Sequence, residues 1–128
     1  MSDRLSGSRR IARVCLLLVA AIAVSGGALQ MIQGQPETTP RLDNVHRFMA
    51  GVYLSTGLIS LWAALTIRRQ EMLVLLIALG ILLSAAGRML SIATMGLPEP
   101  SALWLGYLGI ELVLGSAMAA AWVATRGS

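Results

Sequence analysis

The stretch FMAGVYLSTGLISLWAALTIRRQEMLVLLIALGILLSAAGRMLSIAT, residues 48–94, contains two long apolar runs that meet at a short charged turn. The first run, residues 48–67, has no charged residue, and Arg68, Arg69 and Glu71 end it abruptly. Each run has the ~20 residues that an α-helix needs to cross a ~30 Å hydrocarbon core. Because so short a turn separates the runs, the second helix must return antiparallel to the first, which predicts a transmembrane helical hairpin.

Two further apolar runs lie on either side of this hairpin. Residues 14–32, VCLLLVAAIAVSGGALQMI, precede it, and residues 102–125 follow it with Glu111 as their only charge. The proline-containing segments 34–43 and 96–100 separate the runs, because proline stops a helix and polar turns favour water. The sequence thus predicts four membrane-spanning helices.

The predicted fold is all-α: one polytopic membrane domain over residues 1–128, folded as an antiparallel four-helix bundle. Asp43 or Asn44 is expected to cap the second helix. A secretory signal peptide is the alternative interpretation of the first apolar run, but the run is long for one. The expected helices span about residues 14–33, 45–67, 72–94 and 102–125, after an arginine-rich N-terminal segment, 1–13.

Composition and charge agree with a membrane protein. Hydrophobic residues make up 56% of the chain and charged residues 12%, about half the share of charged residues usual in soluble domains. The net charge of +4 comes from arginines in short clusters between apolar runs, which is typical of cytoplasmic loops and not of a nucleic-acid patch.

The arginines predict the orientation. Short loops rich in basic residues stay cytoplasmic, so both termini and the middle turn are expected inside, with Arg41 and Arg47 on the opposite side. The predicted location is the cell inner (cytoplasmic) membrane. The arginines expected on the inner side are Arg4, Arg9, Arg10, Arg13, Arg68, Arg69 and Arg126.

Two charged residues fall inside predicted membrane helices. Arg88 lies roughly 8 Å and Glu111 roughly 3 Å to the outer side of the midplane, judged from the rise of ~1.5 Å per residue. An isolated charge in hydrocarbon costs ~3 kcal/mol on insertion scales, so each needs a partner or a function. We expect a structural ion pair between Arg88 and Glu111.

Further polar residues lie near the same depth. Arg47, with Asn44 one turn earlier, enters from the outer end of the second helix, and Gln30 lies near the outer end of the first. Small residues flank the charges along each helix and are expected to bring these faces together. The predicted ligand-binding pocket is lined by Asn44, Arg47, Arg88, Glu111 and Gln30, and its surplus positive charge favours an anionic group. The small residues are Gly51 and Ser55, Gly80, Ser84 and Ser91, and Gly115 and Ala119.

Conventional catalytic and metal-binding motifs are absent from the sequence. His46 and Cys15 are the sole histidine and cysteine, too few for a zinc site or a nucleophile triad. Four methionines near the outer end could bind Cu(I) with His46, but without Met-x-x-Met spacing they are better explained as packing residues. We expect no catalytic residue, no metal and no cofactor. The methionines are Met31, Met49, Met89 and Met95.

A set of ordered elements resembles the small four-helix bacterial integral membrane proteins catalogued only as a domain of unknown function. The resemblance covers about residues 14–124 and implies signature positions at Arg47, Arg88 and Glu111, with no established activity. More distantly, the architecture is similar to DoxX-type membrane proteins. The elements are Asn44-x-x-Arg47, Gly51-x-Tyr53-x-x-x-Gly57, Gly87-Arg88, Gly96-x-Pro98 and Glu111.

These features favour a non-enzymatic inner-membrane protein. It is expected either to bind a lipid-like or anionic amphipathic ligand in an outer-leaflet polar pocket or to act as a helper subunit of a membrane complex. The alternatives are a small transporter or channel subunit working as an oligomer, or an accessory subunit of a quinone-linked redox system. Expected partners are membrane lipids and either another membrane protein or further copies of the chain, and not nucleic acid.

Overall fold

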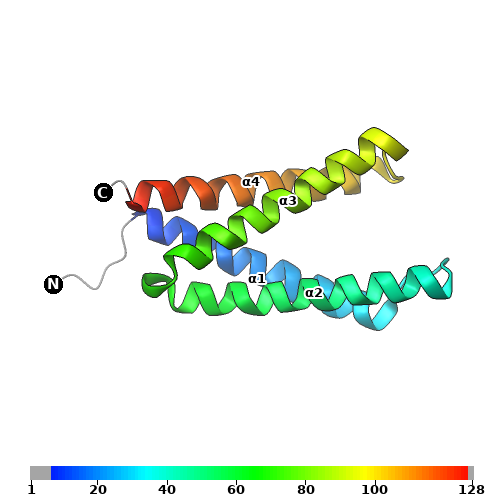
Figure 1. The fold of residues 1–128 in the computed structure, drawn as a ribbon, viewed down its shortest axis with the longest axis horizontal. Coiled ribbons are helices and arrows are strands. Elements are labelled where there is room, and N and C mark those ends of the chain that lie inside the picture. The colour runs from blue at the N-terminus through cyan, green and yellow to red at the C-terminus, as the bar shows by residue number, and fades with distance from the viewer. Residues whose placement is uncertain (1–6, 127–128) are drawn as a thin grey trace.

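Four long α-helices make up the part of the chain that the structure, a computed structural model, describes, residues 7–126 (Figure 1). All four are long and apolar enough to cross a membrane, so the chain is a multi-pass membrane protein with the predicted all-α fold. Arg4, one of the arginines expected on the inner side, lies outside the described residues. The helices are α1 (Gly7–Gln33), α2 (Pro40–Leu65), α3 (Glu71–Met95) and α4 (Ser101–Arg126), and the 3₁₀ turn η1 (Ile67–Arg69) joins α2 to α3.

The helices extend beyond the apolar runs from which they were predicted. α1 begins at Gly7, so Arg9, Arg10 and Arg13 lie within its first turns and not in a segment before it. Arginine has a good helix propensity, and a helix can continue into water after the bilayer ends. The apolar runs therefore underestimated the length of the helix.

The start of α2 differs from the expected cap at Asp43 or Asn44. Thr39 is the N-cap, and its hydroxyl oxygen accepts a hydrogen bond of 3.2 Å from the backbone N–H of Leu42. Pro40 follows at the first helical position, where no backbone N–H is required and the fixed φ of proline suits a helix. Here proline begins the helix.

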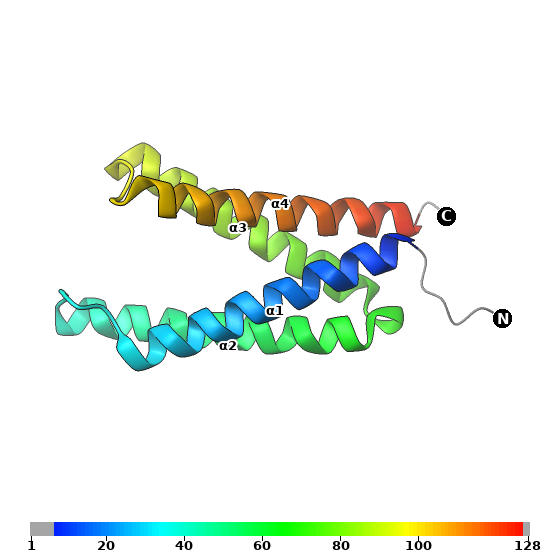
Figure 2. The same ribbon diagram turned by 180° about the vertical axis from the view of Figure 1, so that it is seen from behind.

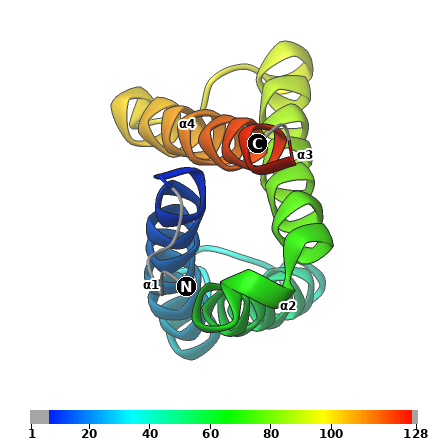
Figure 3. The same ribbon diagram turned by 90° about the vertical axis from the view of Figure 1, so that its left-hand side faces the viewer.

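The helices pack as two antiparallel pairs, α1 with α2 and α3 with α4, and α1 against α4 joins the pairs. Viewed from the end that carries both termini, the order around the bundle is α1, α2, α3, α4 (Figure 3). α2 and α3 are antiparallel, as the short turn predicted, but they contact each other little. The two pairs diverge toward the far end of the molecule (Figures 1 and 2).

The buried core lies near the termini and the α2–α3 turn. Leu16 of α1, Ala64 of α2, Ala78 of α3 and Met118 of α4 are all fully buried there. At this end the side chain of Arg13 donates a hydrogen bond from Nε to the backbone carbonyl of Ala64, at 2.9 Å, and so connects α1 to α2. The end that holds the termini, called the core end below, is therefore where the two helix pairs are joined.

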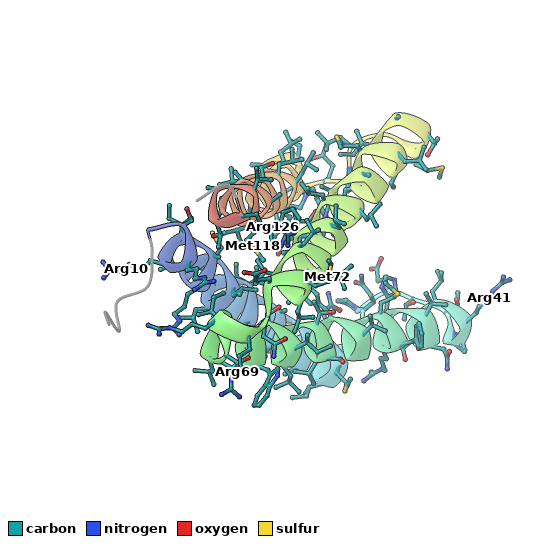
Figure 4. The ribbon with its side chains drawn as sticks, turned by 60° about the vertical axis from the view of Figure 1, so that its left-hand side comes forward. Arg10, Arg41, Arg69, Met72, Met118 and Arg126 are labelled. Atoms are coloured by element: carbon teal, nitrogen blue, oxygen red, sulfur yellow. The ribbon has the colours of Figure 1, made fainter. Side chains whose placement is uncertain are left out.

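Arginines mark the core end as well. Figure 4 shows Arg10 and Arg69 there, with Arg41 at the opposite end. Glu71, at the start of α3, pairs with Arg9 at 3.4 Å and with Arg126 at 3.6 Å, which connects α1, α3 and α4. These exposed pairs contribute little stability each, but they gather basic side chains at one end of the bundle.

Glycine controls how closely helices approach. A Cβ added to Gly27 of α1 would lie 2.8 Å from the backbone nitrogen of Leu54, and one added to Gly57 of α2 would lie 2.8 Å from that of Val24. These glycines let the α1 and α2 backbones come into contact, as small residues do in membranes. The Cβ of an alanine at Gly80 of α3 would instead meet nothing within 4 Å. The expectation that the Gly80 stripe packs closely against another helix is therefore wrong, because this face borders a cavity.

Candidate functional site

The two intramembrane charges are bonded to each other across the α3–α4 pair. Arg88 donates from Nε to Oε1 of Glu111 at 2.7 Å. The side chain of Glu111 is 18% exposed and that of Arg88 is 36% exposed, so the carboxylate is the more deeply buried partner. The pair is neutral as a whole, which lowers the cost of placing either charge in hydrocarbon.

Two aromatic side chains complete the surroundings of Arg88. Its Cζ lies 5.5 Å from the ring centroid of Tyr107 and 5.9 Å from that of Trp104. The two rings meet edge to face, with centroids 5.6 Å apart and an interplanar angle of 82°. Both distances are within the ~6 Å at which a guanidinium is attracted to an aromatic face. Arg88 is thus held by three residues of α4.

The aromatic contacts were missed at the level of sequence, because the predicted pocket contained charged and polar residues and no aromatic one. A signal was nevertheless present. Trp104, Tyr107 and Glu111 follow one another at steps of three and four residues, the spacing that places side chains on one face of a helix. An arginine that reaches Glu111 from the far end of the neighbouring helix therefore lies beside these rings, as Arg88 does.

A cavity of about 400 Å³ lies between the two helix pairs and is lined by residues from all four helices. Its walls are mostly aliphatic, with Ile22 of α1, Val52 of α2, Leu76 of α3 and Leu114 of α4 among them. Glu111 is the one lining residue with a charged side chain. Tyr53 and Thr56 of α2 and Ser84 of α3 supply hydroxyl groups, and Gly80 lies in the α3 wall.

Glu111 connects the ion pair to this cavity. Its Oε1 accepts the bond from Arg88, whereas its Oε2 is buried and has no hydrogen-bond partner among the described residues. Leaving a buried acceptor unsatisfied costs about 1–3 kcal/mol, and more for a charged group. Glu111 is therefore both the charged residue of the largely apolar cavity wall and the acceptor that holds Arg88.

Arg47 lies elsewhere. It donates from Nε to Oδ2 of Asp43 at 2.9 Å, one helical turn away, and from Nη1 to the backbone carbonyl of Met31. Gly34, at a φ of +64° that favours glycine, lies so close that an added Cβ would be 2.7 Å from Nη2 of Arg47. Arg47 thus fastens the end of α1 to the start of α2.

The structure separates the five residues predicted to share one pocket. Arg88 and Glu111 belong to the α3–α4 pair, while Asn44, Arg47 and Gln30 lie exposed at the far end of the α1–α2 pair. The two pairs diverge at that end (Figure 2), and none of these three residues lines the cavity. The position of a residue within its apolar run predicts its depth in the membrane. It does not predict the distance between two helices at that depth.

The separation also changes the electrostatic character of the site. The surplus positive charge expected from two arginines facing one glutamate does not reach the cavity, because Arg47 is neutralised by Asp43 and Arg88 by Glu111. The charged residue that lines the cavity is Glu111, whereas arginines were expected there. Among residues 7–126, no three His, Cys, Asp or Glu side chains lie close enough to hold a metal ion.

Comparison with known proteins gives one match. The model of a family described as Domain of unknown function (DUF4345) matches residues 11–123, most of the chain, and confirms the resemblance to such a domain. No curated protein and no solved structure matches the chain. None of these comparisons connects it with DoxX-type membrane proteins, so that more distant similarity stays a prediction.

Proposed function

The chain belongs to the DUF4345 family, a domain of unknown function, and we propose that it is a non-enzymatic membrane protein that binds one lipid-like, amphipathic molecule between its two helix pairs. The observation that carries the proposal is the cavity of about 400 Å³, which has aliphatic walls and a single charged group, Glu111. Small-molecule sites are typically ~300–1,000 Å³, mostly apolar, with a few polar groups that fix orientation.

The arrangement of the helices supports entry from the membrane. α2 and α3 contact each other little, and the pairs diverge toward the far end of the molecule (Figure 1). A gap between helices that face hydrocarbon admits the acyl chain of an amphiphile without passage through water. The polar end of such a molecule would lie beside Glu111, with its chain against the aliphatic walls.

We further propose that the membrane is the cytoplasmic membrane of a bacterium and that both termini are inside the cell. The described arginines of the α1 start, of η1 and of the α4 end all lie at the core end, whereas Arg41 lies at the other (Figure 4). Such an asymmetry of basic residues favours a cytoplasmic core end. The cavity, which extends from the core toward the far end, would then face the outer leaflet.

Native mass spectrometry of protein purified in mild detergent tests the binding proposal. We expect a retained molecule on the wild type and its loss in Gly80→Leu, which places a side chain in the cavity where an added Cβ meets nothing within 4 Å. Gly87→Leu is the matched control, because Gly87 is on the same helix, is equally open and does not line the cavity.

Two results would contradict the proposal. A wild type that retains no small molecule from native membranes, while remaining folded, would leave the cavity without a ligand. Equal loss in Gly80→Leu and Gly87→Leu would place any retained molecule outside the cavity. Recovery of a stoichiometric protein partner instead of a small molecule would favour the helper-subunit function.

A further inference from the structure

We propose that the core end of the protein binds the headgroup of an anionic phospholipid, on a surface formed by the start of α1 and by η1. This surface, called the basic surface below, comprises Arg10, Arg13, Arg68 and Arg69. None of these residues lines the cavity between the helix pairs. The inference therefore goes beyond the proposed function and does not depend on it.

The first argument is the balance of charge at the core end. Among residues 7–126, the arginines of the α1 start, of η1 and of the α4 end meet one carboxylate there, that of Glu71. Glu71 pairs with Arg9 at 3.4 Å and with Arg126 at 3.6 Å, both of them outside the basic surface. This end of the molecule is therefore strongly positive. The other described carboxylates lie in the middle or at the far end of the bundle and are those of Glu37, Asp43, Glu99 and Glu111.

The second argument is that packing holds the two parts of the basic surface together. α1 contacts η1, and Ile67 of η1 is buried in the core. Arg13 donates from Nε to the carbonyl of Ala64, in the last turn of α2, at 2.9 Å. Arg10 and Arg69, which are far apart in the sequence, are both exposed at this end (Figure 4). A guanidinium offers a planar fork of N–H donors that matches the oxygens of a phosphate.

Exposed aliphatic side chains continue from the basic surface along α1. Arg10, Val14 and Leu18 follow one another at four-residue steps, which places them on one face of the helix, and all three are exposed. From Arg10 to Leu18 this face extends roughly 12 Å along the helix. A phospholipid has the same order of chemistry, an anionic head followed by an apolar chain. The α1 face thus fits a lipid along its length.

Tryptophans near the basic surface support a lipid over a soluble acidic partner. Trp62 is exposed in the last turn of α2, and the ring centroid of Trp122, near the end of α4, lies 5.0 Å from Cζ of Arg126. Tryptophan is enriched where hydrocarbon meets the headgroups, which is the depth of lipid phosphates. Basic pockets between membrane helices bind such headgroups. An acidic segment of a soluble protein would contact the arginines and leave the aliphatic face of α1 unused.

Native mass spectrometry of the full chain in mild detergent, titrated with one purified lipid at a time, tests the inference. The probes are dioleoylphosphatidylglycerol and dioleoylphosphatidylcholine, which share their chains and differ in the net charge of the head. We expect the wild type to bind the anionic lipid about tenfold more tightly, because several arginines near the membrane surface contribute together.

Single replacements at exposed positions locate the binding. Arg10→Gln and Arg69→Gln should each lower the affinity for the anionic lipid about fivefold. Arg41→Gln is the matched control, because Arg41 is an exposed arginine at the far end (Figure 4), and its affinity should stay within about twofold of the wild type. Glu71→Gln should raise the affinity, because it removes the carboxylate that neutralises two arginines.

Several results would overturn the inference. Equal affinity of the folded wild type for the two lipids is one, and a lowered affinity in Glu71→Gln is another. Equal losses in Arg41→Gln and Arg69→Gln would assign the binding to the net charge of the chain. Displacement of the lipid by glycerol phosphate or by poly-glutamate, at the same concentration of negative charge, would assign the surface to a soluble anion or to an acidic protein.

Gly80→Leu separates this inference from the proposed function. Its affinity for the anionic lipid should equal that of the wild type, since Gly80 lies in the cavity wall and not on the basic surface. If Gly80→Leu abolishes binding of the anionic lipid, that lipid lies in the cavity, so the proposed function stands and the inference fails. If Gly80→Leu loses no retained molecule but keeps the preference for the anionic lipid, the inference stands and the proposed function fails.

Discussion

Arg88 of α3 and Glu111 of α4 share a hydrogen bond of 2.7 Å between Nε and Oε1, while the other carboxylate oxygen of Glu111 is buried and has no hydrogen-bond partner within residues 7–126. The bond therefore uses one of the two oxygens of the carboxylate. Its contribution to stability is expected to come from charge neutralisation within the α3–α4 pair.

Either single replacement, Arg88→Leu or Glu111→Leu, is expected to lower the free energy of unfolding by about 2 kcal/mol. This is less than the ~3–5 kcal/mol for breaking a fully buried pair, because an unpaired charge costs ~2.5–3.5 kcal/mol at the centre of a membrane helix and both residues are expected off the midplane. The double replacement should be close to the wild type, since no charge is left uncompensated. Unfolding in mixed detergent micelles, followed by circular dichroism, measures all four proteins. A double variant less stable than both single variants would contradict the expectation.

Gly27→Ala should destabilise the protein by about 1–3 kcal/mol, since overpacking forces backbone to move. The added Cβ would lie 2.8 Å from the nitrogen of Leu54 and 2.9 Å from the carbonyl oxygen of Ala50, both of them backbone atoms of α2. Gly80→Ala is the control. Its Cβ meets nothing, and replacing a helical glycine by alanine favours the helix by ~0.5–1 kcal/mol. The same unfolding assay compares them, and equal effects would contradict the assigned α1–α2 contact.

Arg47→Ala is expected to leave ligand retention unchanged, although the sequence placed Arg47 in the pocket. Its bonds to Asp43 and to the carbonyl of Met31 belong to the α1–α2 end. Because the ion pair is exposed, its loss should cost no more than about 1 kcal/mol of stability. Native mass spectrometry beside Gly80→Leu provides the measurement. Release of the molecule by Arg47→Ala, with the fold intact, would show that Arg47 reaches the ligand after all.

Orientation can be measured by cysteine labelling in a Cys15→Ala background, which removes the sole cysteine of the chain. We expect Thr38→Cys, between α1 and α2, to react with a membrane-impermeant maleimide in intact spheroplasts. Arg69→Cys, in η1, should react only after lysis, because arginine-rich turns are retained inside. Both positions are exposed in the structure, so accessibility within the protein does not distinguish them. The reverse labelling pattern would contradict the proposed topology.

The sequence predicted the number of helices and their antiparallel order because an apolar run of membrane length has few other uses. It erred at the helix ends, since Gly7 and Pro40 begin helices in polar segments where hydropathy carries no signal. Local chemistry would have placed the second start, because Thr39 and Pro40 form a cap followed by a favoured first residue.

The site was predicted in part. The cost of a buried charge was enough to pair Arg88 with Glu111, as the structure pairs them. Depth alone, however, also placed Arg47 beside them. The rotation of each helix and the divergence of the two pairs depend on packing at the core end, from Leu16 to Met118, which no single segment of sequence encodes. The structure was needed to show that Glu111, and not an arginine, faces the cavity.

The buried core lies at one end of the bundle. The α1–α2 and α3–α4 pairs are fastened together near the termini and stand apart at the far end (Figures 1 and 2). A small rotation of one helix pair about the core end would displace its helix ends at the far end, while most of the core would stay buried. The width of the molecule bound between the pairs would then set the angle between them. An occupant deep in the membrane would thereby change the positions of the helix ends at the far surface.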